Sequence, residues 1–183
     1  MALNSYLSLT GKKQGLIKGS VTQKGREGKI MVIAAAHGVN SPRDVATGLP
    51  IGKRVHAPFV ITKEFDASST CLYAALVGSE TLSAWELQFW ASSSTGAEVM
   101  RYVVRMTNAS VSDIPFRMPN NKDPDLARLA EYEEVAFTYE KIEWNWVPGG
   151  LKSGDDWMAK PGVAAVKRRP AAKVGTRTRS EPA

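Results

Sequence analysis

Few side chains in this sequence have the types and spacing that acid–base or metal chemistry requires. The two histidines, His37 and His56, flank a long segment that contains proline and glycine. Neither has an acidic or thiol side chain at the spacing that metal sites use. We therefore expect both histidines to have structural or surface roles, and we expect no metal and no cofactor.

Two further motifs resemble reactive sites but lack an essential part. Gly25-Arg-Glu-Gly-Lys29 has the glycines and the lysine of a phosphate-binding loop, but its spacing is wrong and no helix is expected after it. Glu131, Glu133 and Glu134 are close in sequence, but no apolar residues surround them to raise the pKa of a carboxyl group for acid–base catalysis. We interpret the first motif as an exposed turn or strand start and the glutamates as a solvated strand start.

The remaining candidates for chemistry are a cysteine and two tryptophans. Cys71 is the only cysteine, which excludes a disulfide within the chain, and it lies in an apolar run where a free cysteine acts as a small apolar side chain. Trp144 and Trp146 could stack on bases or sugars, but on an alternating strand a core or subunit contact is favoured. No constellation predicts an enzyme.

The net charge of +6 belongs to one end of the chain. Seven of the 24 basic residues and one of the 18 acidic residues lie in residues 158–183, which leaves 17 of each sign in residues 1–157. A basic balance raises the prospect of nucleic-acid binding, and here that prospect is confined to the tail. The neutral body lacks the positive groove that a nucleic-acid-binding barrel needs, so we regard nucleic acid as an unfavoured alternative partner.

Residues 1–157 and 158–183 are expected to be one folded domain and one disordered tail. The tail has no aromatic side chain and only three valines as its β-branched apolar residues, so it cannot bury enough surface to offset the entropy of ordering. The candidates for binding a polyanion are Lys167, Arg168, Arg169, Lys173, Arg177 and Arg179.

Alternating apolar residues predict a body rich in β-strands. The patterns cover residues 30–36, 56–64, 81–90, 98–107, 111–118 and 132–146, and the last one shifts its apolar phase near its middle. Such a shift indicates a bulge or a strand that changes sheets. One helix is expected, capped by Asp66 or Ser68 and ended by Gly78, with a buried stripe of Cys71, Leu72, Leu76 and Val77.

The fold class that follows is mainly β. About six to eight strands with short turns and one helix favour a closed or nearly closed β-barrel of two packed sheets, with a lateral helix and a long protruding loop. Residues 124–130 add a possible short helical turn. The N-terminus has neither the basic region nor the apolar region of a secretory signal, and no apolar run reaches membrane-spanning length. We expect a chain made in the cytoplasm that does not insert into membranes.

The long loop, residues 41–57, combines turn residues with apolar ones. A loop of this length in a compact domain is usually functional or disordered. Its apolar side chains have no reason to face water, so we predict that it docks on another copy of the chain. The subunit-interface candidates are Ser41, Pro42, Arg43, Asp44, Val45, Leu49, Pro50, Ile51, Lys53, Arg54 and His56.

Several blocks of the body resemble the haemolysin-coregulated protein (Hcp) family of type VI secretion systems. The resemblance covers the whole body, and residues 158–183 depart from it. Among the blocks that carry it are Val21-Thr-Gln-Lys-Gly-Arg-Glu-Gly-Lys29, Ser41-Pro-Arg-Asp44, Gly48-Leu-Pro50, Pro58-Phe-Val-Ile-Thr-Lys-Glu64, Trp85-Glu-Leu-Gln-Phe-Trp90, Met118-Pro-Asn-Asn-Lys-Asp-Pro124 and Lys141-Ile-Glu-Trp144.

This resemblance implies a structural function. Members of the family form β-barrels that assemble into homohexameric rings, and the rings stack into the inner tube that a contractile sheath expels. The resemblance therefore implies further copies of the chain, spike and sheath components, and effector cargo in the lumen as partners. It also implies export from the cytoplasm to the outside or into a target cell, which agrees with the absence of a secretory signal. An enzyme fused to a carrier is the other alternative, and the short tail without histidine or cysteine disfavours it.

Overall fold

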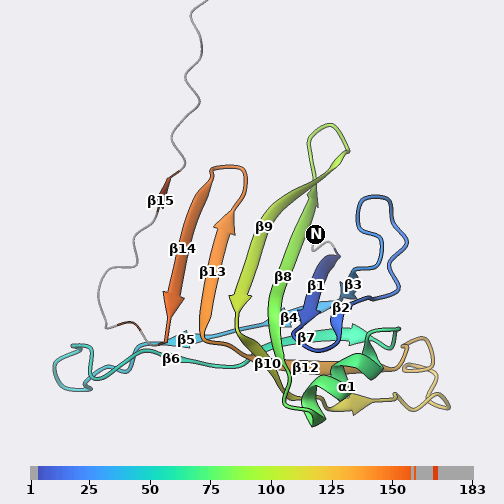
Figure 1. Ribbon diagram of the computed structural model, residues 1–183, viewed down its shortest axis with the longest axis horizontal. Helices are drawn as coiled ribbons and strands as arrows, with labels where there is room; N and C mark the ends of the chain where they lie inside the picture. Colours follow the sequence, from blue (N-terminus) through green and yellow to red (C-terminus); the bar gives the residue numbers. More distant parts are fainter. Residues whose placement is uncertain (1–3, 158, 160–166, 169–183) are drawn as a thin grey trace, which may run out of the picture.

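The computed structural model describes residues 4–157, 159 and 167–168 as a curled β-sheet with one helix (Figure 1). Within these described residues, thirteen strands join one sheet and two form a separate ribbon. The elements are β1 (Ser5–Gly11), β2 (Gly15–Ile17), β3 (Ile30–Val32), β4 (Ala34–Ala36), β5 (Val39–Asn40), β6 (Val55–His56), β7 (Phe59–Glu64), α1 (Ser69–Val77), β8 (Thr81–Ser92), β9 (Glu98–Thr107), β10 (Ala109–Asp113), β11 (Phe116–Arg117), β12 (Tyr132–Thr138), β13 (Lys141–Trp146), β14 (Leu151–Asp156) and β15 (Lys167–Arg168).

The sheet curls because neighbouring strands bend at the same level. β9 and β10 follow each other along one edge of β8, and Asn108 between them has a positive φ of 49°. On their other side β13 pairs with β9 and β12 pairs with β10, so the chain also bends between β12 and β13. Figure 1 shows β8, β9, β13 and β14 upright, with β7 and β12 crossing below them. In place of two packed sheets, the described strands form one curled half-barrel.

These bends explain the phase shift that the sequence shows within residues 132–146. The segment is two strands, β12 and β13, separated by Tyr139 and Glu140. β12 pairs with β7 and β10, whereas β13 pairs with β9 and β14. The side-chain amide of Asn108 donates to the Glu140 carboxylate at 2.6 Å, which ties the two bends together. The chain therefore changes partners, and its apolar side, at this corner.

The core lies inside the curl and is built from alternate residues of the paired strands. Trp85 and Leu87 of β8 are buried there, as their alternation predicts, and Phe89 packs against them partly buried. The Trp85 ring meets Phe59 and Phe137 edge-on, with ring centroids 5.0 and 5.6 Å away. Edge-to-face pairs of this kind stabilise beyond their buried area. β9 occupies the predicted residues, and its Val104 and Met106 face the core.

Helix α1 has the predicted ends but a different buried stripe. Ser68 is its N-cap and Gly78 its C-cap. The Asp66 carboxylate accepts hydrogen bonds from the backbone N–H and the hydroxyl of Ser68, at 2.9 and 2.5 Å. The buried helix residues are Ser69, Leu72 and Ala75, whereas Val77 is 86% exposed, so its predicted burial is wrong. Residues 124–128 form turns in the structure, and the backbone N–H of Ala127 bonds to the Asp123 carbonyl at 2.8 Å, so the short helical turn expected there is a single turn that does not extend into a helix.

One of the three clustered glutamates lies in the core rather than in solvent. Glu133 on β12 is fully buried, and its Oε1 is 2.8 Å from the equally buried Lys63 ammonium on β7. The same ammonium donates to Ser69 Oγ at 2.9 Å and pairs with Asp66 at 3.0 Å. The interpretation of these glutamates as a solvated strand start is therefore wrong for Glu133. This ion pair ties α1 to the sheet, since Ser69 and Asp66 belong to the start of the helix.

The turn predicted for residues 25–29 is present, but its arginine is buried. Gly25 has a φ of +80°, which allows the turn. The Arg26 guanidinium lies 3.7 Å from the centroid of the Trp90 ring and 4.8 Å from that of Tyr6. Its Nη1 also pairs with Glu98 at 2.6 Å. The stacked cation fastens this loop to the sheet.

In the described part of the chain, no helix has the length and apolar character to cross a membrane.

Candidate assembly site

The predicted interface loop is a β-ribbon in the structure, and we call residues 39–56 the arm. β5 and β6 pair at its base, where Val39 faces His56 and Asn40 faces Val55. Further out, Arg43 and Pro50 form an isolated antiparallel bridge. Two backbone bonds of 2.9 Å, from Ile51 N to Pro42 O and from Asp44 N to Leu49 O, continue the ladder. The arm therefore has its own backbone structure, although the sequence shows no hydrophobic period there.

The tip of the arm is a tight, internally bonded turn. The Asp44 carboxylate accepts hydrogen bonds from the Thr47 hydroxyl at 2.8 Å and from the backbone N–H groups of Ala46 and Thr47 at 3.1 and 2.7 Å. These bonds, led by those from Thr47, hold the pKa of Asp44 below its usual value. Gly48 completes the turn with a φ of +68°. A side-chain cap of this kind presets the tip shape before any partner binds.

The arm projects from one end of the molecule (Figure 1), and several of its apolar side chains are exposed. Val45 is fully exposed, Leu49 is 64% exposed and Ile51 is 52% exposed. Of the other predicted interface residues, Ser41, Arg43, Pro50 and Lys53 are exposed, Pro42, Asp44 and Arg54 are half-buried, and His56 is buried. The structure thus brings the predicted residues together on one extension, with His56 at its base.

The base of the arm is held by a cluster of polar side chains that the sequence does not reveal. We call His37, Arg54, His56, Tyr139 and Asp155 the root cluster. The Tyr139 hydroxyl is 2.6 Å from His37 Nε2 and 2.8 Å from His56 Nδ1. His56 Nε2 is 2.6 Å from Asp155 Oδ2, which also accepts from Arg54 Nε. Three separate parts of the chain therefore meet at the arm: residues 37–56, the β12–β13 corner and β14.

The root cluster places a hydroxyl, an imidazole and a carboxylate in a row, as a catalytic triad does, but its hydroxyl is not activated for nucleophilic attack. Burial, and then the charge of Asp155, raise the pKa of the Tyr139 phenol far above its ordinary range. Burial favours a higher pKa for Asp155 as well, but hydrogen bonds from Arg54 and His56 hold it below its usual value. A phenol bonded on both sides and held protonated is not an activated nucleophile. The arrangement can hold or move a proton.

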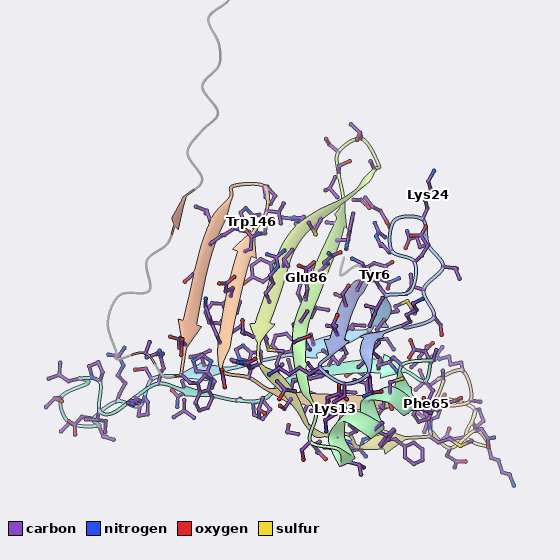
Figure 2. All side chains as sticks on the ribbon, viewed as in Figure 1. Tyr6, Lys13, Lys24, Phe65, Glu86 and Trp146 are labelled. Carbon is purple, nitrogen blue, oxygen red and sulfur yellow. The ribbon has the colours of Figure 1, made fainter. Side chains whose placement is uncertain are left out.

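A second exposed apolar surface lies at the opposite end of the molecule. We call Phe65, Phe116 and the nearby Met118, two residues after Phe116, the Phe116 patch. Phe116 is 58% exposed and Met118 64% exposed, and the rings of Phe65 and Phe116 are in contact with centroids 5.6 Å apart. Figure 2 shows Phe65 at the end away from the arm.

The alternating pattern in residues 111–118 predicts one strand, with Phe116 and Met118 of the Phe116 patch on the same apolar side as Ile114. The strand in fact ends at Asp113, and the short β11 begins after Pro115, which cannot donate to a ladder. Ile114 is buried while Phe116 faces out, so the common face is wrong.

The two tryptophans and the tail residues complete the predicted sites. Trp144 packs partly buried against the core, and Trp146 is partly exposed with the Arg101 guanidinium 5.0 Å from its ring centroid. Lys167 and Arg168 form β15, which pairs with Leu151 and Lys152 at the edge of β14. The other tail candidates, Arg169, Lys173, Arg177 and Arg179, lie outside the described residues.

Comparisons with known proteins agree on one family. The family model described as "Type VI secretion system effector, Hcp" matches residues 6–146. The "Major exported protein" of Pseudomonas aeruginosa is 40% identical over an alignment of 168 residues, and the match covers 87% of this chain and 98% of that protein. A solved Hcp protein superposes with a TM-score of 0.80 at 27% identity, covering 86% of this chain and 99% of that one. The secreted protein Hcp3 from Pseudomonas aeruginosa gives 0.70 at 33% identity, covering 85% and 99%. The chain therefore belongs to the Hcp family of type VI secretion system proteins.

Proposed function

We propose that this protein is a tube subunit of a type VI secretion system, which assembles through its arm into stacked hexameric rings and leaves the cell. The observation that carries the proposal is the arm itself: a preshaped ribbon with Val45, Leu49 and Ile51 exposed, in a chain of the Hcp family. Apolar groups on a protruding ribbon gain free energy only when a partner covers them. The secreted or exported relatives support export of this chain as well.

The second half of the contact is the Phe116 patch. A cyclic ring uses heterologous contacts, in which one surface of a subunit meets a different surface of the next. The arm and the Phe116 patch lie at opposite ends of the curled sheet (Figure 2), as head-to-tail contacts require. We propose that the arm tip of one copy covers Phe116 and Met118 of its neighbour.

A ring also needs a rigid subunit, and we infer that the curled sheet closes on itself as a barrel. β8 pairs with β1 along one edge and with β10 along the other. β10 pairs with β12, β12 with β7 and β7 with β4. β4 follows β3 directly in the chain, and β3 pairs with β1. This cycle of pairings supports closure around the core.

A mixing experiment tests the head-to-tail contact. We expect the arm variant Val45→Ser/Leu49→Ser/Ile51→Ser and the patch variant Phe116→Ser/Met118→Ser each to be monomeric. Mixed together, they should give heterodimers, because the intact arm of the patch variant can bind the intact patch of the arm variant. Native mass spectrometry of each variant and of the mixture measures this. Full rings from either variant alone, or a mixture that stays monomeric while both remain folded, would contradict the contact.

The family also suggests what the assembled protein meets. We propose that the rings stack beneath spike components inside a sheath, and that the lumen holds effector cargo. The solvent side of β8 and β9 carries a charge pair, Arg105 Nε bonded to Glu86 at 2.6 Å, and next to it Lys29 Nζ donates to the neutral amide oxygen of Gln88 at 2.7 Å. The labelled Glu86 lies midway along this face in Figure 2. Paired charges of this kind keep a surface polar without giving it one dominant sign.

The basic tail is proposed to bind a polyanion or to tune stacking. Residues 158–183 hold all of the net charge of +6, so a ring of copies would gather many positive charges of one sign. We expect a chain truncated after Trp157 to keep its thermal stability while losing salt-sensitive binding to an anionic polymer such as heparin. Light scattering and binding isotherms across a salt series measure both effects. Identical stacking and binding of the two chains at every ionic strength would show that the tail has neither function.

A further inference from the structure

Both histidines of the chain lie in the root cluster, although they are 19 positions apart in sequence. His37 precedes β5 and His56 ends β6, so the two flank the arm where it leaves the body. Their rings have centroids 6.0 Å apart, and the Tyr139 hydroxyl is bonded to both. This hydroxyl links the two imidazoles, so the proton on each one depends on the other.

Counting hydrogens shows how many protons the cluster accepts. The Tyr139 hydroxyl has one hydrogen and two nitrogen neighbours, so both bonds form only when one nitrogen carries a hydrogen and the other is bare. With neutral histidines, His37 Nε2–H donates to the hydroxyl oxygen, the hydroxyl donates to His56 Nδ1, and His56 Nε2–H donates to Asp155. When one proton is added to either histidine, every hydrogen bond can still form. The histidine that stays neutral adopts the tautomer that leaves the Tyr139 hydroxyl with one donor and one acceptor.

A second proton breaks the arrangement. Both nitrogens that face the hydroxyl then carry a hydrogen, and the Tyr139 O–H has no acceptor left in a buried position. A buried donor without an acceptor loses its hydrogen bond to water and gains none in the protein, which destabilises the arrangement. Two neighbouring imidazolium ions also repel each other. The cluster therefore accommodates one imidazolium and not two.

The charged groups around the two histidines differ, and the difference disfavours protonation of His37. Asp155 from β14 faces His56, and Arg54 from the arm pairs with Asp155 and donates to the backbone oxygen of Asp156 at 2.7 Å. His37 has no carboxylate against it in the described contacts. Burial, and then the charge of His56, lower the pKa of His37 below its ordinary value.

Apolar rings complete the surroundings of both imidazoles. Phe59 stacks on His37 with centroids 5.2 Å apart, and Trp144 lies 6.4 Å from it. Trp157 lies 5.3 Å from His56. These rings supply no charge, so Asp155, Arg54, Asp156 and Tyr139 are the titratable groups that face the pair.

We propose that the root cluster is a pH-sensitive latch, which holds the base of the arm at neutral pH and releases it when both histidines are protonated. The released root binds one more proton than the latched root. Its population therefore rises as pH falls, by up to about tenfold per pH unit. Burial favours a higher pKa for Asp155, but the hydrogen bonds from Arg54 and His56 hold that pKa below its usual value, so this carboxylate does not take up the extra proton.

The consequence for assembly rests on the proposed function of the arm. Release of the base lets the arm swing, and a mobile arm loses the preset shape that favours docking on a neighbour. Acidic conditions would then weaken ring assembly. The latch itself does not depend on rings, since every group in it belongs to one chain.

Hydrogen exchange at the base of the arm tests the latch. The probe amide is that of Ala57, bonded to the Gly38 carbonyl at 2.9 Å, together with the β5–β6 pair. We would measure exchange by mass spectrometry at pH 7.5 and 5.5, corrected for intrinsic rates, in the full chain and in the arm variant Val45→Ser/Leu49→Ser/Ile51→Ser. The second chain keeps the root cluster and reports on the latch whether or not rings form. Both chains should lose up to about tenfold of their protection at pH 5.5.

Two substitutions separate the latch from general acid loosening. His37→Gln keeps a donor toward Tyr139 but cannot titrate, so its protection should be the same at both pH values. Tyr139→Phe removes the linking hydroxyl, so its arm base should exchange quickly at both. Lys152→Gln, an exposed change on β14 outside the root cluster and outside the arm, should behave like the unmodified chain.

The latch is overturned by unchanged protection of the full chain between pH 7.5 and 5.5. It is equally overturned if His37→Gln keeps the full pH response. If His37→Gln does not fold, Tyr139→Phe decides: full protection at pH 7.5 in that variant contradicts the latch. A latch that opens with acid while ring assembly ignores pH would instead leave the latch standing and contradict the arm contact of the proposed function.

Discussion

Replacing Lys63 by methionine is expected to destabilise the fold by about 3–5 kcal/mol, because it leaves a buried carboxylate without its partner. The Lys63 ammonium and Glu133 are fully buried and 2.8 Å apart, and the same ammonium contacts Asp66 and Ser69 at the start of α1. The substitution keeps most of the side-chain volume, so the loss reports charge rather than packing. Urea unfolding of the full chain, followed by tryptophan fluorescence, measures it.

Two controls assign this loss to the buried charge. Lys141→Met removes an exposed ion pair, in which Nζ lies 3.0 Å from Glu143 Oε1, and should change stability by no more than about 1 kcal/mol. Lys63→Met/Glu133→Leu removes both buried charges and should be more stable than Lys63→Met alone. A loss below about 1 kcal/mol for Lys63→Met would mean that Glu133 is not held as a buried carboxylate.

The triple substitution Val45→Ser/Leu49→Ser/Ile51→Ser is expected to abolish ring assembly and leave unfolding of the single chain almost unchanged. All three side chains are exposed in the free chain, so their removal costs no core packing. If a neighbour covers these side chains in the ring, each substitution removes about 1 kcal/mol or more of binding free energy. Three such losses weaken each interface by roughly a hundredfold in Kd. Sedimentation of the assembled protein and thermal unfolding of the dilute protein measure the two effects separately.

A matched variant controls for general solubility. Leu16→Ser/Val77→Ser/Val99→Ser removes three exposed apolar side chains that lie outside both the arm and the Phe116 patch. We expect it to assemble as the unmodified chain does. If it disrupts assembly as strongly as the arm variant does, the loss reflects overall surface polarity. If the arm variant unfolds at a much lower temperature, the arm supports the body rather than a neighbour.

Local patterns in the sequence predicted the regular elements well. The alternation in residues 98–107 gives β9 with its observed bounds, and Ser68 and Gly78 mark the ends of α1. These signals succeed because capping and strand alternation depend on neighbouring residues. β1 is not among the predicted strands, although Leu7 and Leu9 alternate with polar residues and are fully buried. Its signal is short, and only the pairing with β8 and β3 makes it a strand.

The sites depend on contacts between distant residues, which local patterns do not contain. Glu133 looks like part of a solvated acidic cluster, yet Lys63 lies opposite it on the neighbouring strand. The root cluster joins His37 to Tyr139 across 102 positions and His56 to Asp155 across 99. The arm could be predicted because its signal is compositional: apolar residues among turn residues. Its ribbon pairing could not, since its strands are only two residues long.

The central claim is that copies of this chain join head to tail in closed rings through the arm. Native mass spectrometry of the full chain at high micromolar concentration in low-salt buffer tests it most directly. The account predicts a dominant species with the mass of six copies, which disappears in the Val45→Ser/Leu49→Ser/Ile51→Ser variant. A strictly monomeric full chain under these conditions, or six-copy rings that persist in that variant, would contradict it.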